Sequence, residues 1–212
     1  LGLVQSNYHS VFNREVYEGS EIIHLLDRLH PLFFSSVPYI SQDKIEYLAL
    51  KTLEMGGYNG CINPEFLCEV INLFEYRIEI NPSLIKCDIL ALCDFQNRVV
   101  RLSQISSLPR LAFTLAHEIG HILENDFSSD EGNSESYLRS EEQADQFAKD
   151  FLIRPEDYQA FVETGNFDKT DILRFSEEID IHPSVVLGRL QNEGILGFDR
   201  FRELKENYYF VS

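Results

Sequence analysis

The chain has 212 residues, of which 44% are hydrophobic, a length and composition that suit one globular domain with a buried core. No apolar run approaches the roughly 18 residues of a membrane-spanning helix, and the N-terminus lacks the basic start and apolar block of a secretory signal. The formal net charge is −17, and residues 117–180 contain 18 Asp or Glu against 5 Lys or Arg. Because this excess repels phosphate backbones, we expect the chain to bind neither nucleic acid nor membrane.

The four cysteines do not have the spacing of a structural zinc cluster, in which ligands come in close pairs. They are Cys61, Cys68, Cys87 and Cys93. Without a secretory signal, reduced thiols in a cytoplasmic protein are the expectation. The first residue is Leu1 rather than Met, which leaves open a longer parent protein with a DNA-binding domain upstream.

The first part of the chain reads as helical. Apolar residues at helical spacing predict a short helix over residues 20–30, inside an N-terminal extension formed by residues 1–38. A second helix is expected over residues 41–55 and a third over residues 63–75. Asn63 is expected to cap the third helix, because Pro follows it at the first helical position.

Strand patterns come next. The alternation in residues 76–80 predicts a strand that ends at Asn81-Pro82. Residues 87–102 predict a hairpin, with two β-rich runs around a turn at residues 95–97. We therefore expect a small, mainly antiparallel three-stranded sheet in a mostly helical α+β fold.

A helix that begins near residues 107–109 contains the stretch RLAFTLAHEIGHILEN, residues 110–125. Its His117 and His121 are four residues apart, so they lie on one helical face and both imidazoles can reach one ion. Zn²⁺ takes such nitrogen ligands in tetrahedral sites that keep one position open for water. Glu118 points to the side of the pair and can take a proton from that water.

The residues around this motif argue against a chance occurrence. The flanks are mostly apolar, which indicates a buried helix where unpaired polar groups would be costly. These flanking residues are Leu111, Phe113, Leu115, Ala116, Ile119, Ile122 and Leu123. Gly120 costs about 1 kcal/mol relative to Ala in a helix interior, which suggests the close approach of another element.

A later helix, expected over residues 140–153, offers a third ligand. Glu141 and Asp145 are one turn apart and share a face with Ala144, so Glu141 can reach the metal from the core boundary. Asp145 can then accept the outer N–H of a ligand histidine. Glu142, about 100° around the helix, is the competing ligand. The plain alternative for both glutamates is an acidic helix start that the helix dipole favours.

These residues carry a resemblance. FTLAHEIGHIL followed by E-x-x-A-D-x-F-A resembles the ImmA/IrrE family of zinc metallopeptidases, most closely over residues 110–155. The resemblance implies zinc ligands at His117, His121 and Glu141, with Glu118 as the catalytic base. It also implies that the substrate is a protein, a helix-turn-helix repressor or antitoxin-like regulator. Its cleavage would relieve transcriptional repression in a stress response.

The expected organisation is a peptidase core over residues 39–158 and a C-terminal helical segment over residues 159–212 that packs on it. Residues 171–196 read as helix, turn, helix, with Pro at a helix start and Gly at its end. The pattern mimics a DNA-binding motif, yet Arg174 and Arg189 are its only basic residues. We interpret it as the helical segment common in the family.

Two roles stay open from the sequence. His182, just before Pro183, reads as a turn or capping residue rather than a fourth ligand. A group that stabilises the oxyanion is not assigned, and Tyr137, Arg139 and His182 are the candidates.

The sequence is compatible with three functions. The first is a zinc endopeptidase with one specific protein substrate. The second is a non-catalytic metal-binding regulatory or sensor module that binds a protein partner. The third, a DNA-binding transcription factor, is opposed by the net charge of −17. The sequence makes no prediction of oligomeric state.

Overall fold

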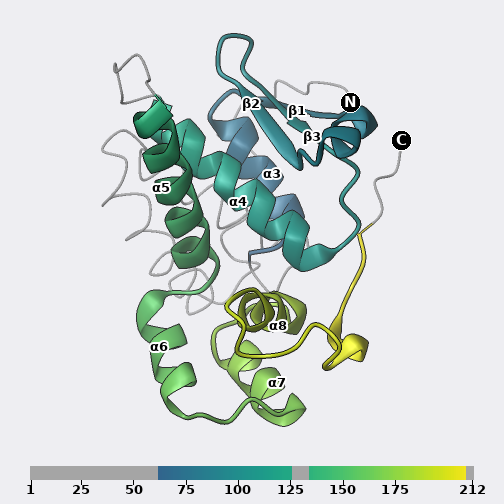
Figure 1. Ribbon diagram of the computed structural model, residues 1–212, viewed down its shortest axis with the longest axis vertical. Coiled ribbons are helices and arrows are strands. Elements are labelled where there is room, and N and C mark those ends of the chain that lie inside the picture. Colours follow the sequence, from purple (N-terminus) through teal and green to yellow (C-terminus); the bar gives the residue numbers. More distant parts are fainter. Residues whose placement is uncertain (1–61, 126–133, 209–212) are drawn as a thin grey trace, which may run out of the picture. The chain divides into compact units, whose positions relative to one another are not determined.

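The computed structural model describes residues 62–125 and 134–208, which belong to the compact unit Gly56–Ser212. The N-terminal extension and the first two expected helices lie outside the described residues. The described part is a mostly helical α+β fold with one small sheet, as predicted (Figure 1). Among the described residues, no helix is both long and apolar enough to cross a lipid bilayer.

Helix α3 (Pro64–Leu73) begins where the sequence places it. The side chain of Asn63 accepts a hydrogen bond from the Phe66 backbone N–H at 2.8 Å, and Pro64 occupies the first helical position. One face of the helix is fully buried, and Phe66 and Val70 lie on it. This face packs α3 against the motif helix.

The sheet contains β1 (Arg77–Ile80), β2 (Ala91–Asp94) and β3 (Val99–Leu102) in the order β1-β3-β2. β2 and β3 form the predicted antiparallel hairpin, with Asp94 opposite Val99. β1 pairs with β3 in parallel, so the sheet is mixed rather than mainly antiparallel. The 3-10 helix η2 (Pro82–Cys87) follows β1, and the hairpin returns β3 in the direction of β1.

The motif helix α4 (Leu108–Asn125) contacts α3, β2 and two later helices. Its closest partner is α5 (Ser134–Leu152), which runs beside it (Figure 1). A Cβ added to Gly120 would lie 3.0 Å from the Cα of Ala144 and 3.3 Å from the Phe147 ring. The close approach predicted from Gly120 is therefore confirmed, and the approaching element is α5.

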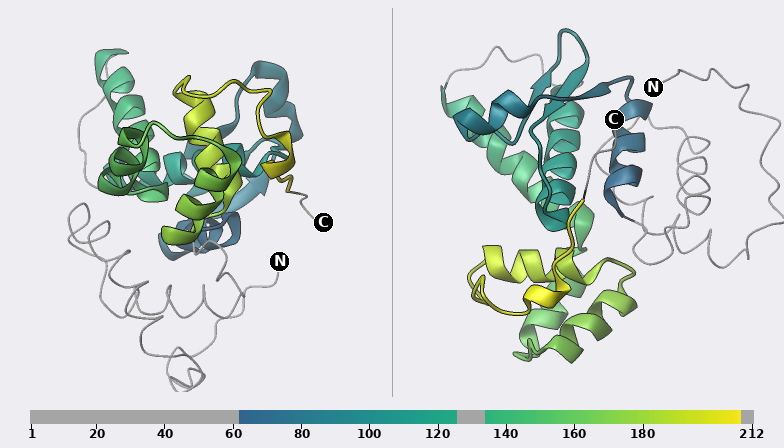
Figure 2. Two further views of the ribbon diagram at one scale, coloured as in Figure 1. Left: turned by 90° about the horizontal axis from the view of Figure 1, so that it is seen from below. Right: turned by 90° about the vertical axis from the view of Figure 1, so that its right-hand side faces the viewer.

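The remaining helices are α6 (Pro155–Glu163), α7 (Lys169–Glu178) and α8 (Pro183–Asn192), followed by the short 3-10 helix η3 (Arg202–Leu204). α8 contacts both α7 and the start of α4 (Figure 2).

Arg189 joins α8 to the end of α5, because its Nη1 donates to the backbone oxygens of Lys149 at 3.0 Å and Ile153 at 3.1 Å. The Lys149 oxygen also accepts from the Ile153 backbone N–H at 3.1 Å, and the Ile153 oxygen, just beyond the helix, gains a partner that the ended helix does not provide.

The contact between α8 and α4 leads to a prediction about Gly188. In an isolated helix, Gly188→Ala would stabilise by about 1 kcal/mol. Here the added Cβ would lie 2.6 Å from Pro109 Cβ, a rigid ring atom of α4. We expect the variant to be destabilised by roughly 1–3 kcal/mol, as measured by denaturant unfolding. The control is Gln143→Ala on the exposed face of α5, where no loss is expected. An unchanged or higher stability of Gly188→Ala would contradict the packing described.

Candidate metal centre

Two histidines of α4 face one another across a single helical turn. His117 Nε2 and His121 Nε2 lie 3.0 Å apart, and the rings meet edge to face. Both side chains are mostly buried, with 16% and 14% of their surface exposed. The i, i+4 spacing in the sequence therefore brings both ring nitrogens to one point, as predicted.

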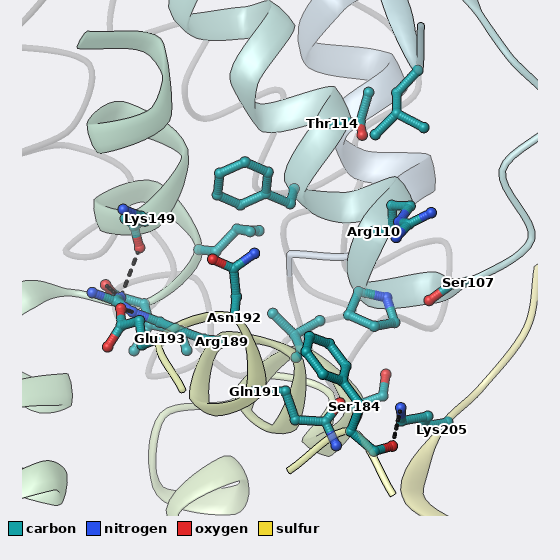
Figure 3. A pocket seen from close by; sticks show the side chains of 18 residues that line it. Ser107, Arg110, Thr114, Lys149, Ser184, Arg189, Gln191, Asn192, Glu193 and Lys205 are labelled. Atoms are coloured by element: carbon teal, nitrogen blue, oxygen red, sulfur yellow. Dashed lines mark hydrogen bonds and ion pairs between the residues drawn. The ribbon is translucent and has the colours of Figure 1, made fainter. Parts of the chain in front are cut away.

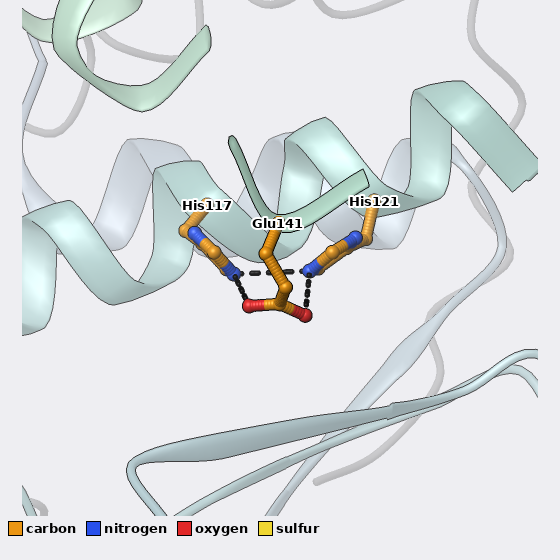
Figure 4. A group of neighbouring side chains, drawn as sticks. All are labelled: His117, His121 and Glu141. Atoms are coloured by element: carbon orange, nitrogen blue, oxygen red, sulfur yellow. Dashed lines mark hydrogen bonds and ion pairs between the residues drawn. The ribbon is translucent and has the colours of Figure 1, made fainter. Parts of the chain in front are cut away.

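Glu141 reaches the same point from α5 (Figure 4). Its two carboxylate oxygens lie 3.4 Å from His117 Nε2 and 3.2 Å from His121 Nε2. The three side chains thus offer one ligand atom each, all within 4.8 Å of one another. Glu142 is exposed and is not part of this group within residues 62–125 and 134–208. The structure thus places Glu141 beside the histidines, and its role as a metal ligand stays a prediction.

Outer hydrogen bonds set the orientation of both imidazoles. His117 Nδ1 lies 2.8 Å from Asp145 Oδ1, so the Nδ1–H donates to this carboxylate and the lone pair of Nε2 faces Glu141. Asp145 thus lies beside His117, and its role in orienting this ligand stays a prediction. His121 Nδ1 lies 3.3 Å from the hydroxyl of Ser140. Sequence reasoning missed Ser140, whose only signal was its place next to Glu141.

Burial favours the form of His121 that binds metals. Removal from water lowers the pKa of His121 below its ordinary value, and the nearby His117 lowers it further. The Glu141 carboxylate acts in the opposite direction but is the smaller effect. A neutral imidazole with its lone pair toward the cluster is the state that a divalent cation requires.

The donor set fits a zinc ion. Zinc bonds of about 2.0–2.1 Å in tetrahedral geometry place two ligand atoms roughly 3.3 Å apart. His117 Nε2 and His121 Nε2 lie 3.0 Å apart, and each has one of the two Glu141 oxygens at 3.4 and 3.2 Å, respectively, which are separations close to that spacing. Two imidazole nitrogens and a carboxylate oxygen are also the ligand types that zinc accepts. The residues would hold such an ion without rearrangement of the helices.

Glu118 lies beside the cluster and is almost fully buried, with 4% of its surface exposed. In the part of the chain that the structure describes, its Oε2 atom has no hydrogen-bond partner. Burial raises the pKa of Glu118 to about 8, and the negative charge of Glu141 adds to this. A cation held by Glu141 and the histidines would oppose both effects. The buried carboxylate is thus the second feature that fits a bound metal.

The three candidates for an oxyanion donor, Tyr137, Arg139 and His182, make different contacts in the structure. The hydroxyl of Tyr137, one turn before Glu141 on α5, hydrogen-bonds to Glu141, and this contact raises the pKa of the phenol. His182 instead caps α8, accepts from the Ser184 backbone N–H, and lies 2.6 Å from Glu206. The prediction of His182 as a capping residue is confirmed. Arg139 is exposed and makes no described contact with the cluster.

Comparison with known protein families gives one match. Residues 78–191, more than half of the chain, match the model of peptidase family M78, described as an IrrE N-terminal-like domain. The chain belongs to this family. The match includes His117, His121 and Glu141, so the family assignment and the geometry concern the same residues. The resemblance to ImmA/IrrE peptidases is confirmed, and a function of the metallopeptidase type follows. Neither the curated proteins nor the solved structures gave a significant match.

The adjacent residues Glu141 and Glu142 of this M78 family member provide a matched test of the third ligand. Glu141→Gln is expected to weaken zinc binding by more than about 100-fold, beyond the 10–100-fold typical of residues that only support a ligand. Glu142→Gln makes the same change of charge one residue away and should leave the zinc affinity unchanged. Competition with a chromophoric chelator measures both. Equal effects, or a larger effect at Glu142, would show that Glu141 is not the ligand.

Asp145 is expected to act through His117. Asp145→Asn should weaken zinc binding by about 10–100-fold, because a carboxamide holds the Nδ1–H less strongly than a carboxylate does. Asp150→Asn, on the same helix, is the control, because Asp150 contacts Gln146 and not the cluster. The two affinities are compared by isothermal titration with zinc. If Asp145→Asn binds zinc as tightly as the control, then Asp145 has no role in orienting His117.

Proposed function

We propose that this M78 family member is a zinc-dependent endopeptidase that cleaves one specific protein. The convergence of His117 Nε2, His121 Nε2 and the Glu141 carboxylate within 3.0–3.4 Å carries this proposal. The buried Glu118 beside them supplies the second requirement of peptide hydrolysis, a group that transfers protons.

The residues divide the chemistry among them. His117, His121 and Glu141 would hold zinc, which when bound supplies an activated water and polarises the carbonyl of the cleaved peptide bond. Glu118 accepts the proton that the attacking water loses as the new C–O bond forms. It then donates this proton to the amine nitrogen as the C–N bond breaks. Asp145 keeps His117 in the required tautomer throughout.

The sheet offers a place for an extended substrate. β2 contacts α4 and lies at one edge of the sheet. Among the described strands it pairs only with β3, so we propose its other edge as the place where an extended substrate aligns. An extended peptide binds such an edge through main-chain hydrogen bonds.

The proposed substrate is a helix-turn-helix repressor or antitoxin-like regulator, cleaved in the cytoplasm to relieve repression. The family resemblance supports this class of substrate. The charge also supports it, because residues 117–180 contain 18 acidic against 5 basic residues, and DNA-binding proteins carry basic surfaces. Association of the two is then favoured at low ionic strength.

Glu118→Gln tests the mechanism. The variant should bind zinc but cleave about 10²–10⁴-fold more slowly, because the amide cannot accept the proton. Cleavage of candidate repressors is followed by mass spectrometry, and zinc content is measured on the same samples. A chelator should stop cleavage by the unsubstituted protein, and added zinc should restore it.

Glu142→Gln is the control and should cleave normally, since Glu142 is exposed and outside the cluster. Cleavage by Glu118→Gln at the full rate would exclude Glu118 as the base. Stable complexes with a repressor, without cleavage by the zinc-loaded protein, would instead indicate the non-catalytic regulatory module.

A further inference from the structure

A pocket of about 490 Å³ opens beside the metal centre, between α4, the end of α5 and α8 (Figure 3). Its apolar wall includes side chains from all three helices and from the segment that follows α8. These are Pro109, Phe113, Leu152, Ile153, Val185 and Phe198. A volume of this size accommodates a large side chain of a bound peptide together with part of its backbone.

The pocket lies on the same faces of α4 and α5 as the metal centre. Phe113 lines it and is one turn before His117, with ring centroids 6.4 Å apart. Lys149 lines it from α5 and is one turn after Asp145, the partner of His117. One helical turn is about 5.4 Å, and an extended peptide advances about 3.3 Å per residue. A substrate residue one or two positions from the cleaved bond would therefore reach the pocket.

The charged residues that line the pocket are mostly basic, whereas the chain as a whole is acidic. Its lining contains four basic residues, Arg110, Lys149, Arg189 and Lys205, and one carboxylate, Glu193. Arg189 is neutralised by Glu193, since their side chains lie 3.1 Å apart, and Lys205 donates to the Phe198 backbone oxygen. These three residues are therefore occupied.

Arg110 and Lys149 are not occupied in this way. Among the residues with described positions, neither side chain has an ion-pair partner. They come from different helices and lie on opposite sides of the pocket in Figure 3. The chain has only 18 basic residues against 35 acidic ones, so two basic side chains without a described hydrogen-bond or ion-pair partner beside one apolar pocket favour an anionic ligand.

We propose that this pocket is a specificity subsite that receives a large apolar side chain of the substrate, with an acidic residue on each side of it, one paired with Arg110 and the other with Lys149. The proposal rests on the proposed peptidase function and adds the local sequence that the enzyme selects. The overall negative charge does not oppose it, because charges beyond about 8 Å are screened at physiological ionic strength. Repulsion by the distant acidic surface is therefore weak at the pocket, whose lining carries four basic side chains and one carboxylate.

Binding of short peptides tests the subsite apart from cleavage. The probes are fluorescent peptides with a Gly/Ser background and a central Glu-Phe-Glu, Lys-Phe-Lys or Glu-Ala-Glu. They are titrated into zinc-loaded Glu118→Gln protein, which holds but does not cleave them. The Glu-Phe-Glu peptide should bind about tenfold more tightly than Lys-Phe-Lys, because two partly exposed charge pairs form. It should exceed Glu-Ala-Glu by a similar factor, since only Phe fills the apolar pocket.

Charge reversal at Arg110 and Lys149 tests whether these two residues cause the preference for the acidic peptide. Adding Arg110→Glu and Lys149→Glu should invert the order of the Glu-Phe-Glu and Lys-Phe-Lys peptides. The matched control is Lys86→Glu with Arg202→Glu, which changes the net charge equally at exposed positions outside the pocket and should keep the original order. Thermal unfolding of both double variants verifies that they fold.

Three results would overturn the subsite. These are a preference for the basic peptide before any charge reversal, an acidic preference that survives the reversal at Arg110 and Lys149, and no binding of any peptide up to about 1 mM. The proposed peptidase function is judged separately by the cleavage of repressors. A clear peptide preference without any cleavage would therefore keep the subsite and reject the enzyme.

Discussion

The contact between α4 and α5 at Gly120 is the constraint on which the site depends. A Cβ at Gly120 would lie 3.0 Å from the Cα of Ala144. The two backbones are therefore so close that there is hardly room for a side chain at position 120. This distance lets the short side chain of Glu141 reach both histidines of the other helix. With a larger residue at either position the helices would separate and the three ligand atoms would no longer converge.

A positive charge in the site would remove its main electrostatic cost. Glu118 and Glu141 place two carboxylates close together in surroundings with little water, and the raised pKa of Glu118 expresses the cost of ionising it there. A divalent cation would reverse the balance, because it favours the ionised carboxylates and the neutral imidazoles at the same time. Metal binding and the charge state of Glu118 are therefore parts of one equilibrium.

The sequence predicts the local features of this fold well. Spacing within one helix places His117 and His121 together, Asn63 caps α3, and the cost of a mid-helix glycine indicates a close neighbour. Features that depend on distant segments are harder. β1 pairs with β3 in parallel because of the course of the segment between β1 and β2, which includes η2. The alternation of apolar residues does not predict that course. Glu141 rather than Glu142 approaches the histidines because of how α5 rotates against α4, and Ser140 and Tyr137 join the cluster for the same reason.

Arg189 links the C-terminal helices to the helix that carries Glu141. Its guanidinium holds the last carbonyls of α5, lies 3.7 Å over the Tyr158 ring of α6, and pairs with Glu193 at the end of α8. A single mostly buried cation thus joins three helices, and each loses its partner if α8 detaches. The segment after α5 and the helix that carries Glu141 are therefore expected to unfold together, as one cooperative unit rather than as a core with a removable appendage.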